Sequence, residues 1–184
     1  ILRSYVLSQD AEHYDGVIEA LEARGLKAIP AFASGLDARE AIEKYFMKDG
    51  RPTVEAVVSL TGFSLVGGPA YNDSDAAAKL LKDLDTPYLS AQALEFQTLD
   101  GWGGGERGLS PVEATMMVAI PELDGATNPI VFGGRAAEGA TCAGCDRSCY
   151  FEADGGARRM RSCVERANAL ADRVKALVEL RAKP

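Results

Sequence analysis

The chain has 184 residues, of which 47% are hydrophobic, so it can bury one sizeable core, with a small appendage at most. Its net charge of −7 argues against a nucleic-acid partner, because phosphate contacts need clustered Lys and Arg side chains that carboxylates do not oppose. No apolar run approaches the ~18 residues of a transmembrane helix, and the start at Ile1, inside a strand-like run, leads us to expect a fragment of a longer protein.

The first forty residues alternate strand and helix patterns. We predict a strand over residues 2–7, followed by a helix that ends at Gly25 and whose apolar positions are Tyr14, Val17, Ile18 and Leu21. A second strand is predicted over residues 28–33. Beyond it, Asp37 can cap a helix, and Glu40 three residues later completes a capping-box pattern.

The strongest strand pattern is the uninterrupted apolar run of residues 56–60. Such a run is typical of a parallel strand whose two faces are both covered by helices. The run ends at Thr61-Gly62-Phe63, and we predict a helix over residues 73–84 and a short strand over residues 88–91 after it.

The second half of the chain begins with a clear helix start. In Ser110-Pro111-Val112-Glu113, the serine is an N-cap, the proline suits the first helical position and the glutamate stands three residues after the cap, which predicts a helix body over residues 114–120. A strand over residues 130–132 follows, and we expect Gly133-Gly134 to break it. Apolar positions every three or four residues predict a long amphipathic helix over residues 160–180.

Strands that alternate with helices predict an α/β fold, with a Rossmann-like open, mostly parallel sheet flanked by helices. We assign residues 1–135 to this α/β domain, and residues 136–184 to a cysteine-rich loop and a long C-terminal helix that packs on the same domain. Ligands of such sheets bind at the carboxyl ends of the strands, which here are Ser34-Gly35, Thr61-Gly62-Phe63 and the loop after Ser90.

All four cysteines lie in the last quarter of the chain. Cys142 and Cys145 are separated by two residues, Cys145 and Cys149 by three, and Cys163 follows after thirteen more. Four thiolates with two tight spacings and one distant ligand fit either a 4Fe–4S cluster or a tetrahedral zinc site, and the spacing mildly favours iron–sulfur. Two disulfides or free thiols are the remaining alternatives.

Several long segments resemble the porphyrin-binding H subunits of magnesium chelatases. The most idiosyncratic is residues 57–70, Val-Val-Ser-Leu-Thr-Gly-Phe-Ser-Leu-Val-Gly-Gly-Pro-Ala. The others are Glu19-Ala20-Leu21-Glu22-Ala23-Arg24-Gly25, Phe32-Ala33-Ser34-Gly35-Leu36-Asp37, Glu43-Lys44-Tyr45-Phe46, Ile120-Pro121-Glu122-Leu123-Asp124-Gly125 and Pro129-Ile130-Val131-Phe132. Together they cover residues 1–135 in the family's order, and they look closer to the magnesium branch than to the cobalt-inserting relatives.

The resemblance implies a cytoplasmic protein of chlorophyll or bacteriochlorophyll synthesis. In the magnesium chelatases of this family, the H subunit binds protoporphyrin IX, the substrate into which Mg is inserted. It implies as partners the remaining domains of the H subunit and two AAA-type subunits, I and D, that hydrolyse ATP. The family's histidine-containing G-T-H-G segment is absent here, so the fragment should not catalyse chelation alone. Among H subunits, those of anoxygenic phototrophs can carry an oxygen-sensitive centre, which favours a 4Fe–4S cluster with a redox or structural role.

The resemblance also suggests residues for the porphyrin or Mg side. Thr61, Gly62 and Phe63 follow the best strand, and an aromatic residue there could form a wall for a flat macrocycle. Glu95 and Glu122 could deprotonate pyrrole nitrogens or hold a hydrated Mg ion, although helix capping and solvent-facing charge also explain carboxylates there. The sole histidine, His13, could face the ligand cleft, or it could be a solvated or capping histidine.

Two other functions stay open from the sequence. The first is a non-catalytic module for redox sensing or docking. The second is a small α/β domain, similar to periplasmic binding proteins, that binds a small polar molecule and carries no metal.

Overall fold

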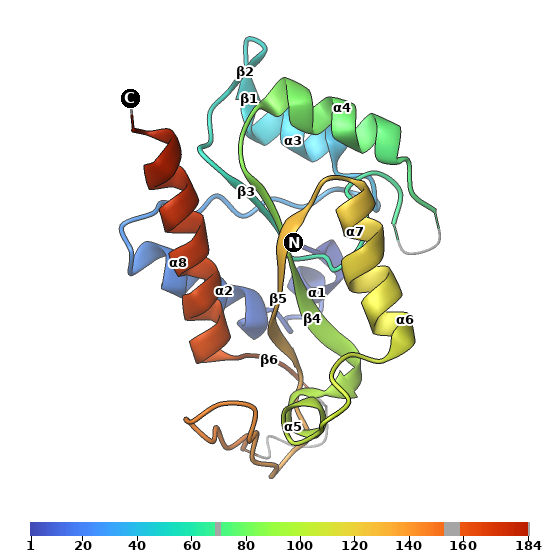
Figure 1. Cartoon of the computed structure of the whole chain (residues 1–184), viewed down its shortest axis with the longest axis vertical. Coiled ribbons are helices and arrows are strands. Elements are labelled where there is room, and N and C mark those ends of the chain that lie inside the picture. The colour runs from blue at the N-terminus through green and yellow to red at the C-terminus, as the bar shows by residue number, and fades with distance from the viewer. Residues whose placement is uncertain (69–70, 153–158, 184) are drawn as a thin grey trace.

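The computed structural model of the chain describes residues 1–68, 71–152 and 159–183 (Figure 1). Its helices are α1 (Arg3–Leu7), α2 (Glu12–Glu22), α3 (Arg39–Tyr45), α4 (Ser74–Leu84), α5 (Leu99–Gly103), α6 (Pro111–Ala114), the π-helical turn η1 (Thr115–Ala119), α7 (Ile120–Leu123) and α8 (Val164–Arg181). Its strands are β1 (Met47–Lys48), β2 (Arg51–Pro52), β3 (Val57–Ser59), β4 (Tyr88–Thr98), β5 (Thr127–Arg135) and β6 (Met160–Ser162). Within these ranges, no helix combines the length and apolar character that a membrane span requires.

The central sheet has four strands in the order β3-β4-β5-β6. β3, β4 and β5 are parallel, and β6 runs antiparallel to β5. A separate two-stranded hairpin joins β1 and β2. The predicted α/β class with an open, mostly parallel sheet is therefore confirmed.

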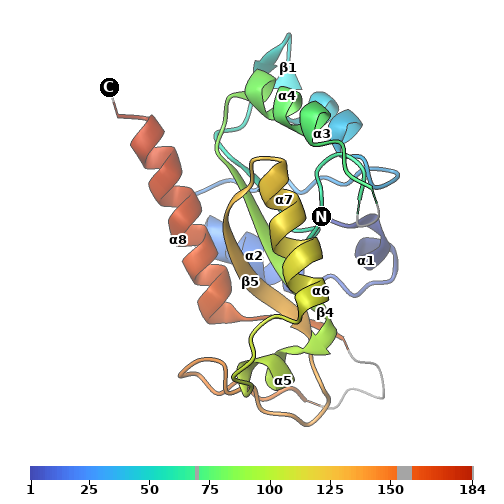
Figure 2. The ribbon, with the colours of Figure 1, turned by 45° about the vertical axis from the view of Figure 1, so that its right-hand side comes forward.

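Helices cover both faces of this sheet (Figures 1 and 2). On one face, Leu89 and Ala91 of β4 pack in the main hydrophobic cluster with Val17 of α2 and Leu170 of α8. On the other face, the buried Gln92 amide donates a 2.6 Å hydrogen bond to the Met117 carbonyl oxygen in η1. The side chains of β4 alternate between the two helical layers, as expected for a central strand.

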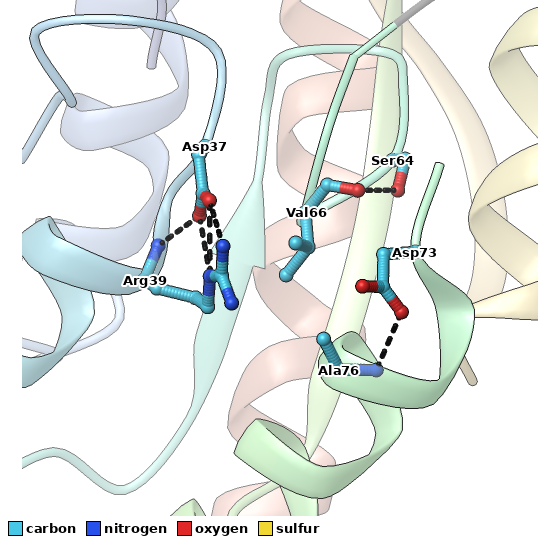
Figure 3. Close-up of polar contacts among 6 residues, drawn as sticks. All are labelled: Asp37, Arg39, Ser64, Val66, Asp73 and Ala76. Carbon is cyan, nitrogen blue, oxygen red and sulfur yellow. Dashed lines mark hydrogen bonds and ion pairs between the residues drawn. The ribbon is translucent and has the colours of Figure 1, made fainter. Parts of the chain in front are cut away.

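The capping signal at one helix start behaves as the sequence predicts, and the signal at another does not. Ser110 and Glu113 form the reciprocal capping box at the start of α6, and the helical run extends through η1 and α7 to Leu123. Asp73 caps α4. The predicted box at Asp37 is wrong, because Ala38 is the N-cap of α3 and the Asp37 carboxylate binds the backbone nitrogen and guanidinium of Arg39 instead (Figure 3).

Two predicted strands near the N-terminus are not strands. Residues 2–7, whose apolar pattern is β-type, contain helix α1, whose Tyr5 is buried among the rings of His13 and Tyr14. The segment of residues 28–33 is outside every helix and strand and pairs with none of the described strands. An apolar pattern alone makes neither segment a strand, because strand identity needs a neighbouring strand to pair with.

Two further boundaries are set by pairing with β5. We expected Gly133 and Gly134 to break the strand, but both continue β5. A Cβ atom on Gly134 would lie 2.7 Å from the Cβ of Leu94 in β4. Close approach of neighbouring strands therefore requires glycine here. Residues 160–162, expected as the start of the last helix, form β6 against β5, and α8 begins only at Val164.

Candidate functional site

The loop after β3 holds the residues that the sequence singles out most strongly. The hydroxyls of Ser59 and Thr61 lie 2.9 Å apart, which fixes the first turn of the loop. Gly62 has a φ angle of +72°, and its α-carbon faces the Met117 side chain, where a Cβ would come within 3.4 Å of the methyl carbon. Phe63 is half-buried. The loop is therefore closely packed on its η1 side.

A buried carboxylate anchors this loop. Asp124 Oδ2 accepts hydrogen bonds from the Ser64 hydroxyl at 2.8 Å and from the backbone nitrogen of Leu65 at 2.7 Å. Asp124 is only 1% exposed. The Ser64 hydroxyl also lies 3.0 Å from the Val66 carbonyl oxygen (Figure 3). Sequence reasoning missed Asp124, although it lies within the quoted 120–125 segment.

Backbone contacts tie the same loop to two helices. The Ala38 nitrogen, at the start of α3, donates to the Leu65 carbonyl oxygen at 3.0 Å. The Asp73 nitrogen donates to the Val66 carbonyl oxygen at 2.9 Å, and the Asp73 carboxylate accepts from the Ala76 nitrogen to cap α4 (Figure 3). The carboxyl end of β3 is thus fixed by α3, α4 and the turn before β5.

An apolar cavity of about 470 Å³ lies beside the loop, between β3 and the segment that follows α2. Its apolar lining includes Ile18, Leu21, Phe32, Phe46, Val58 and Val178. Thr61 and Phe63 also line it, and Arg3 and Lys27 are cationic residues in its wall. The volume falls in the range of about 300–1,000 Å³ that is usual for ligand pockets.

His13 lies in an aromatic cluster in the core. It is 0% exposed, its ring centroid is 3.8 Å from that of Tyr14, and it stacks at 5.9 Å on Phe132. Neither ring nitrogen has a hydrogen-bond partner among the residues described. Burial, with the positive charge of Arg135, lowers the pKa of His13 to about 4, so the ring is neutral near pH 7. The expectation that His13 faces a cleft or solvent is therefore wrong.

The two predicted glutamates lie at opposite ends of the sheet. Glu95 is exposed on β4 near its carboxyl end. It faces Tyr5, whose pKa is raised by burial and by hydrogen bonding to Glu95. Glu122 is exposed on α7, which leads into the amino end of β5. Because β4 and β5 are parallel, the structure does not bring Glu95 and Glu122 together, and their binding roles stay predictions.

A second buried carboxylate belongs to the helix start at Ser110. Glu113 is 0% exposed, and its Oε2 accepts from the Ser110 backbone nitrogen at 2.9 Å and from the Gln97 amide at 2.6 Å. The side chain therefore joins α6 to the end of β4. This role is structural, and the capping box was its sequence signal.

The first three cysteines lie on a narrow loop. Its ends are joined by the Cys142 nitrogen, which donates to the Cys149 carbonyl oxygen at 2.8 Å, and by an antiparallel bridge between Thr141 and Tyr150. Cys142 is 6% exposed, and its thiol contacts the Leu99 carbonyl oxygen at 3.5 Å. The loop is therefore docked on α5 through its first cysteine.

The fourth cysteine comes from a different element. Cys163 is the N-cap residue of α8, and all four cysteines are free thiols. Burial raises the pKa values of Cys149 and Cys163, and the neighbouring Cys145 and Cys142 raise both further. An effect of Cys142 and Cys145 on both residues requires that the four sulfurs share one region of the molecule.

The donor set fits an iron–sulfur or zinc centre, but the site is not closed. Over residues 1–68, 71–152 and 159–183, no three His, Cys, Asp or Glu side chains form a metal-binding group. The Arg166 guanidinium, in the first turn of α8, stacks 4.4 Å over the Trp102 ring of α5. This contact joins the first turn of α8, which follows Cys163, to α5, on which the 142–149 loop is docked.

Comparison with known proteins gives one family for the whole chain. The family model described as CobN/Magnesium Chelatase matches residues 1–184. The chain is 54% identical over 182 residues to the magnesium-chelatase H subunit of Cereibacter sphaeroides, and 51% identical over 181 residues to that of Rhodobacter capsulatus. Each match covers 98% of this chain and 15% of the relative, so the chain spans about a seventh of the length of these proteins.

A solved structure has the same fold. The catalytic subunit of cobaltochelatase from Mycobacterium tuberculosis superposes with a TM-score of 0.72 and 22% sequence identity. The match covers 100% of this chain and 14% of that subunit. At this identity the likeness concerns the fold alone.

Proposed function

Because the chain belongs to the CobN/magnesium chelatase family, we propose that it is one domain of the H subunit of a magnesium chelatase. In this proposal the longer protein binds protoporphyrin IX and is the site at which Mg²⁺, the second substrate, is inserted. The observation that carries the proposal is the close similarity, along almost the whole chain, to proteins named as magnesium-chelatase H subunits.

The wider assembly follows from the same proposal. Two AAA-type subunits, I and D, hydrolyse ATP and drive insertion, and the product enters bacteriochlorophyll biosynthesis in the cytoplasm. The domain alone inserts no metal, because the chain lacks the family's G-T-H-G segment. Its catalytic residues belong to the rest of the longer protein.

Within the domain, we assign porphyrin contact to Thr61 and Phe63. Both follow a parallel strand at its carboxyl end, which is the usual position of ligand contacts in open α/β sheets. The anchors from Asp124, Ala38 and Asp73 keep this loop in one conformation, as a binding surface requires. Glu95 is exposed at the carboxyl end of β4 and is the carboxylate that can reach a ligand on that side.

The chelatase proposal is tested with the full-length subunit. Protoporphyrin IX, Mg²⁺, ATP and both partner subunits should produce the fluorescence of a magnesium porphyrin, and omission of either partner should abolish it. A protein that inserts Co²⁺ into a corrin-type ring and leaves protoporphyrin IX metal-free would overturn the magnesium assignment. A Phe63→Ala variant should weaken porphyrin binding in a quenching titration, whereas Phe96→Ala, on an exposed aromatic residue of β4, is the matched control.

The alternatives give different results in the same titration. A non-catalytic docking module would bind no tetrapyrrole at all in the context of the full-length protein. A small-molecule-binding domain would bind a polar ligand and would leave porphyrin fluorescence unchanged.

We further propose that Cys142, Cys145, Cys149 and Cys163 bind a 4Fe–4S cluster, with zinc as the alternative metal. Two observations support a shared site: Cys142 and Cys145 contribute to the raised pKa values of Cys149 and Cys163, and none of the four is in a disulfide. A bound cation removes the cost of burying thiolates, because it stabilises their charged form. The cluster would join the 142–149 loop to the start of α8 and has a structural or redox role.

Metal analysis of protein purified without oxygen tests this site. About four irons and four sulfides per chain, with a broad absorption band near ~400 nm, are expected for a cubane cluster. Cys142→Ser or Cys163→Ser should lose the iron, while the control Tyr150→Phe, on an exposed residue of the same loop, should retain it. One zinc per chain would identify the alternative metal, and a metal-free protein would refute the site.

A further inference from the structure

Polar side chains form a buried layer beneath the loop that follows β3. Ser59 of β3 is the register partner of Ser90 of β4, so their side chains lie next to each other on one face of the sheet. Tyr88 shares this face, because side chains two residues apart on a strand point to the same side. The face is the one covered by α4 and η1. Solvent is excluded from it, since the exposed fractions of Ser59, Ser90 and Tyr88 are 8%, 1% and 5%.

The carboxylate of Asp124 borders this layer. Tyr88 packs in one hydrophobic cluster with Leu65 and Ala126. Leu65 donates its backbone N–H to Asp124, and Ala126 follows Asp124 by two residues. The Thr127 hydroxyl donates to the Tyr88 carbonyl oxygen at 3.2 Å, which ties the turn after Asp124 to the start of β4. Asp124 and Tyr88 are therefore neighbours in the fold.

The electrostatics of Tyr88 agree with this arrangement. Burial raises the pKa of the Tyr88 phenol most strongly, the Ser59 hydroxyl lowers it, and the Asp124 carboxylate raises it further. Both side chains must lie close to the phenol oxygen to have these effects. The Tyr88 and Ser59 hydroxyls are near each other without a hydrogen bond of regular geometry between them.

Three buried oxygen atoms of this group have no hydrogen-bond partner among the described residues. They are the Tyr88 hydroxyl, the Ser90 hydroxyl and Oδ1 of Asp124. Buried polar atoms in folded proteins nearly always have partners, and an unsatisfied one destabilises the folded state. Three such atoms in one layer therefore indicate a bound species that contacts them.

The charge of Asp124 indicates which kind of species this is. Its Oδ2 accepts from the Ser64 hydroxyl and the Leu65 nitrogen, both of them neutral donors. No Lys, Arg or His side chain of the part of the chain that the structure describes forms an ion pair with this carboxylate. Burial of an unpaired carboxylate is costly, and a water molecule would satisfy Oδ1 without balancing its charge. A cation does both.

We propose that Asp124, Tyr88 and Ser90 bind one monovalent cation, Na⁺ or K⁺, with the Ser59 hydroxyl as a fourth oxygen ligand. All of these donors are oxygen atoms, which suit alkali and alkaline-earth ions, whereas softer metals prefer sulfur or imidazole ligands. A single carboxylate balances one positive charge. Mg²⁺ would leave one charge unbalanced in the interior and would keep several of its waters. The ion is thus distinct from the Mg²⁺ of the proposed reaction, and the inference does not depend on that reaction.

The cation would join three segments beneath the candidate site. Ser59 belongs to β3, Tyr88 and Ser90 belong to β4, and Asp124 lies in the turn before β5. The Ser59 hydroxyl is also hydrogen-bonded to that of Thr61, which lines the apolar cavity. An ion at this point would hold the end of β3 and its loop in the position that presents Thr61 to the cavity.

Urea unfolding at pH 7 in different salts tests the proposal. A ligand that binds only the folded chain, at about 100 times its dissociation constant, raises the folding equilibrium constant roughly 100-fold. At equal ionic strength, KCl or NaCl should raise this constant at least ~10-fold relative to tetramethylammonium chloride, whose methyl groups keep oxygen ligands away from the charge. The salt with the larger effect identifies the ion. Equal constants in all three salts would overturn the proposal.

The Asp124→Asn variant separates the charge of this residue from its hydrogen bonds. The asparagine oxygen can still accept from Ser64 and Leu65, but the negative charge is gone, so the difference between salts should disappear. Asp73→Asn is the matched control, because Asp73 caps α4 and asparagine caps helices equally well. It should retain the salt effect. A salt effect that survives in Asp124→Asn, or that is lost in both variants, would contradict the assignment.

Crystals of the protein soaked in Tl⁺, an electron-rich substitute for alkali ions, test the position directly and need no variant. An anomalous peak is expected beside Asp124 Oδ1, in contact with the hydroxyls of Tyr88 and Ser90. Ordered water there in its place, or no peak, would refute the cation site. None of these measurements involves metal insertion, so failure of the chelatase proposal would leave their result intact.

Discussion

Replacement of Asp124 by alanine should destabilise the fold by about 3 kcal/mol. The carboxylate is 1% exposed and accepts hydrogen bonds from Ser64 and Leu65. A hydrogen bond to a charged group contributes about 1.5–3 kcal/mol, and a buried N–H left without an acceptor costs about 1–3 kcal/mol. The Ser64 hydroxyl can still reach the Val66 carbonyl oxygen, so most of the loss comes from the Leu65 nitrogen.

Urea unfolding at 25 °C and pH 7, followed by circular dichroism, measures this loss. With a slope of about 2 kcal/mol per molar urea, the midpoint should fall by roughly 1.5 M. The matched control is Glu122→Ala, two residues away on an exposed position, which should stay within about 0.5 kcal/mol of the parent. A loss below 1 kcal/mol for Asp124→Ala, or an equal loss in the control, would refute the anchoring role.

The remaining predictions use other residues of the domain. The pKa of His13 is lowered from 6.5 to about 4 in the folded state, so the unfolded chain binds more protons between pH 4 and pH 6.5. The free energy of unfolding should therefore be full above pH 6.5 and should fall by about 3 kcal/mol as the pH falls to 4. His13→Phe should lack this component in urea titrations across that range, and an unchanged pH profile would contradict the assignment. Gly134→Ala should cost at least about 2 kcal/mol, since its Cβ meets β4 backbone, whereas Gly35→Ala, which meets nothing within 4 Å, should be nearly neutral in thermal unfolding. Arg166→Ala should lose about 0.5–1 kcal/mol and shift the emission of Trp102, the sole tryptophan, to the red; an unchanged spectrum would argue against the stacking.

Features that depend on a few neighbouring residues could be predicted from the sequence. The capping box at Ser110 needs only the hydroxyl, the proline and the glutamate of one helical turn, and the structure forms it. The apolar run of residues 56–60 contains β3, and residues 73–84 contain α4 with its Asp73 cap. The resemblance of the 57–70 segment also indicated the family, which the match over the whole chain confirms.

The candidate site was only partly predictable, because burial is decided by the whole fold. Thr61 and Phe63 line the cavity as expected for residues after a strand. The family resemblance led us to expect that His13 could face the ligand cleft, yet three aromatic rings enclose it. Asp124 was not singled out, since a carboxylate before a glycine also fits an exposed turn, and only the packing of the β3 loop against it makes it an anchor.

The sequence by itself determined the capping box at Ser110, the strongest strand and the alternation that defines the α/β class, because each depends on residues close together in the chain. The tertiary structure alone decided which apolar segments become strands. Residues 160–162 are a strand because β5 lies beside them, Gly133 and Gly134 continue β5 because β4 and β6 approach closely, and residues 28–33 remain unpaired because no strand of the described residues occupies the cavity next to them. A strand forms its hydrogen bonds with partners far away in the sequence, so its existence is a property of the assembled sheet.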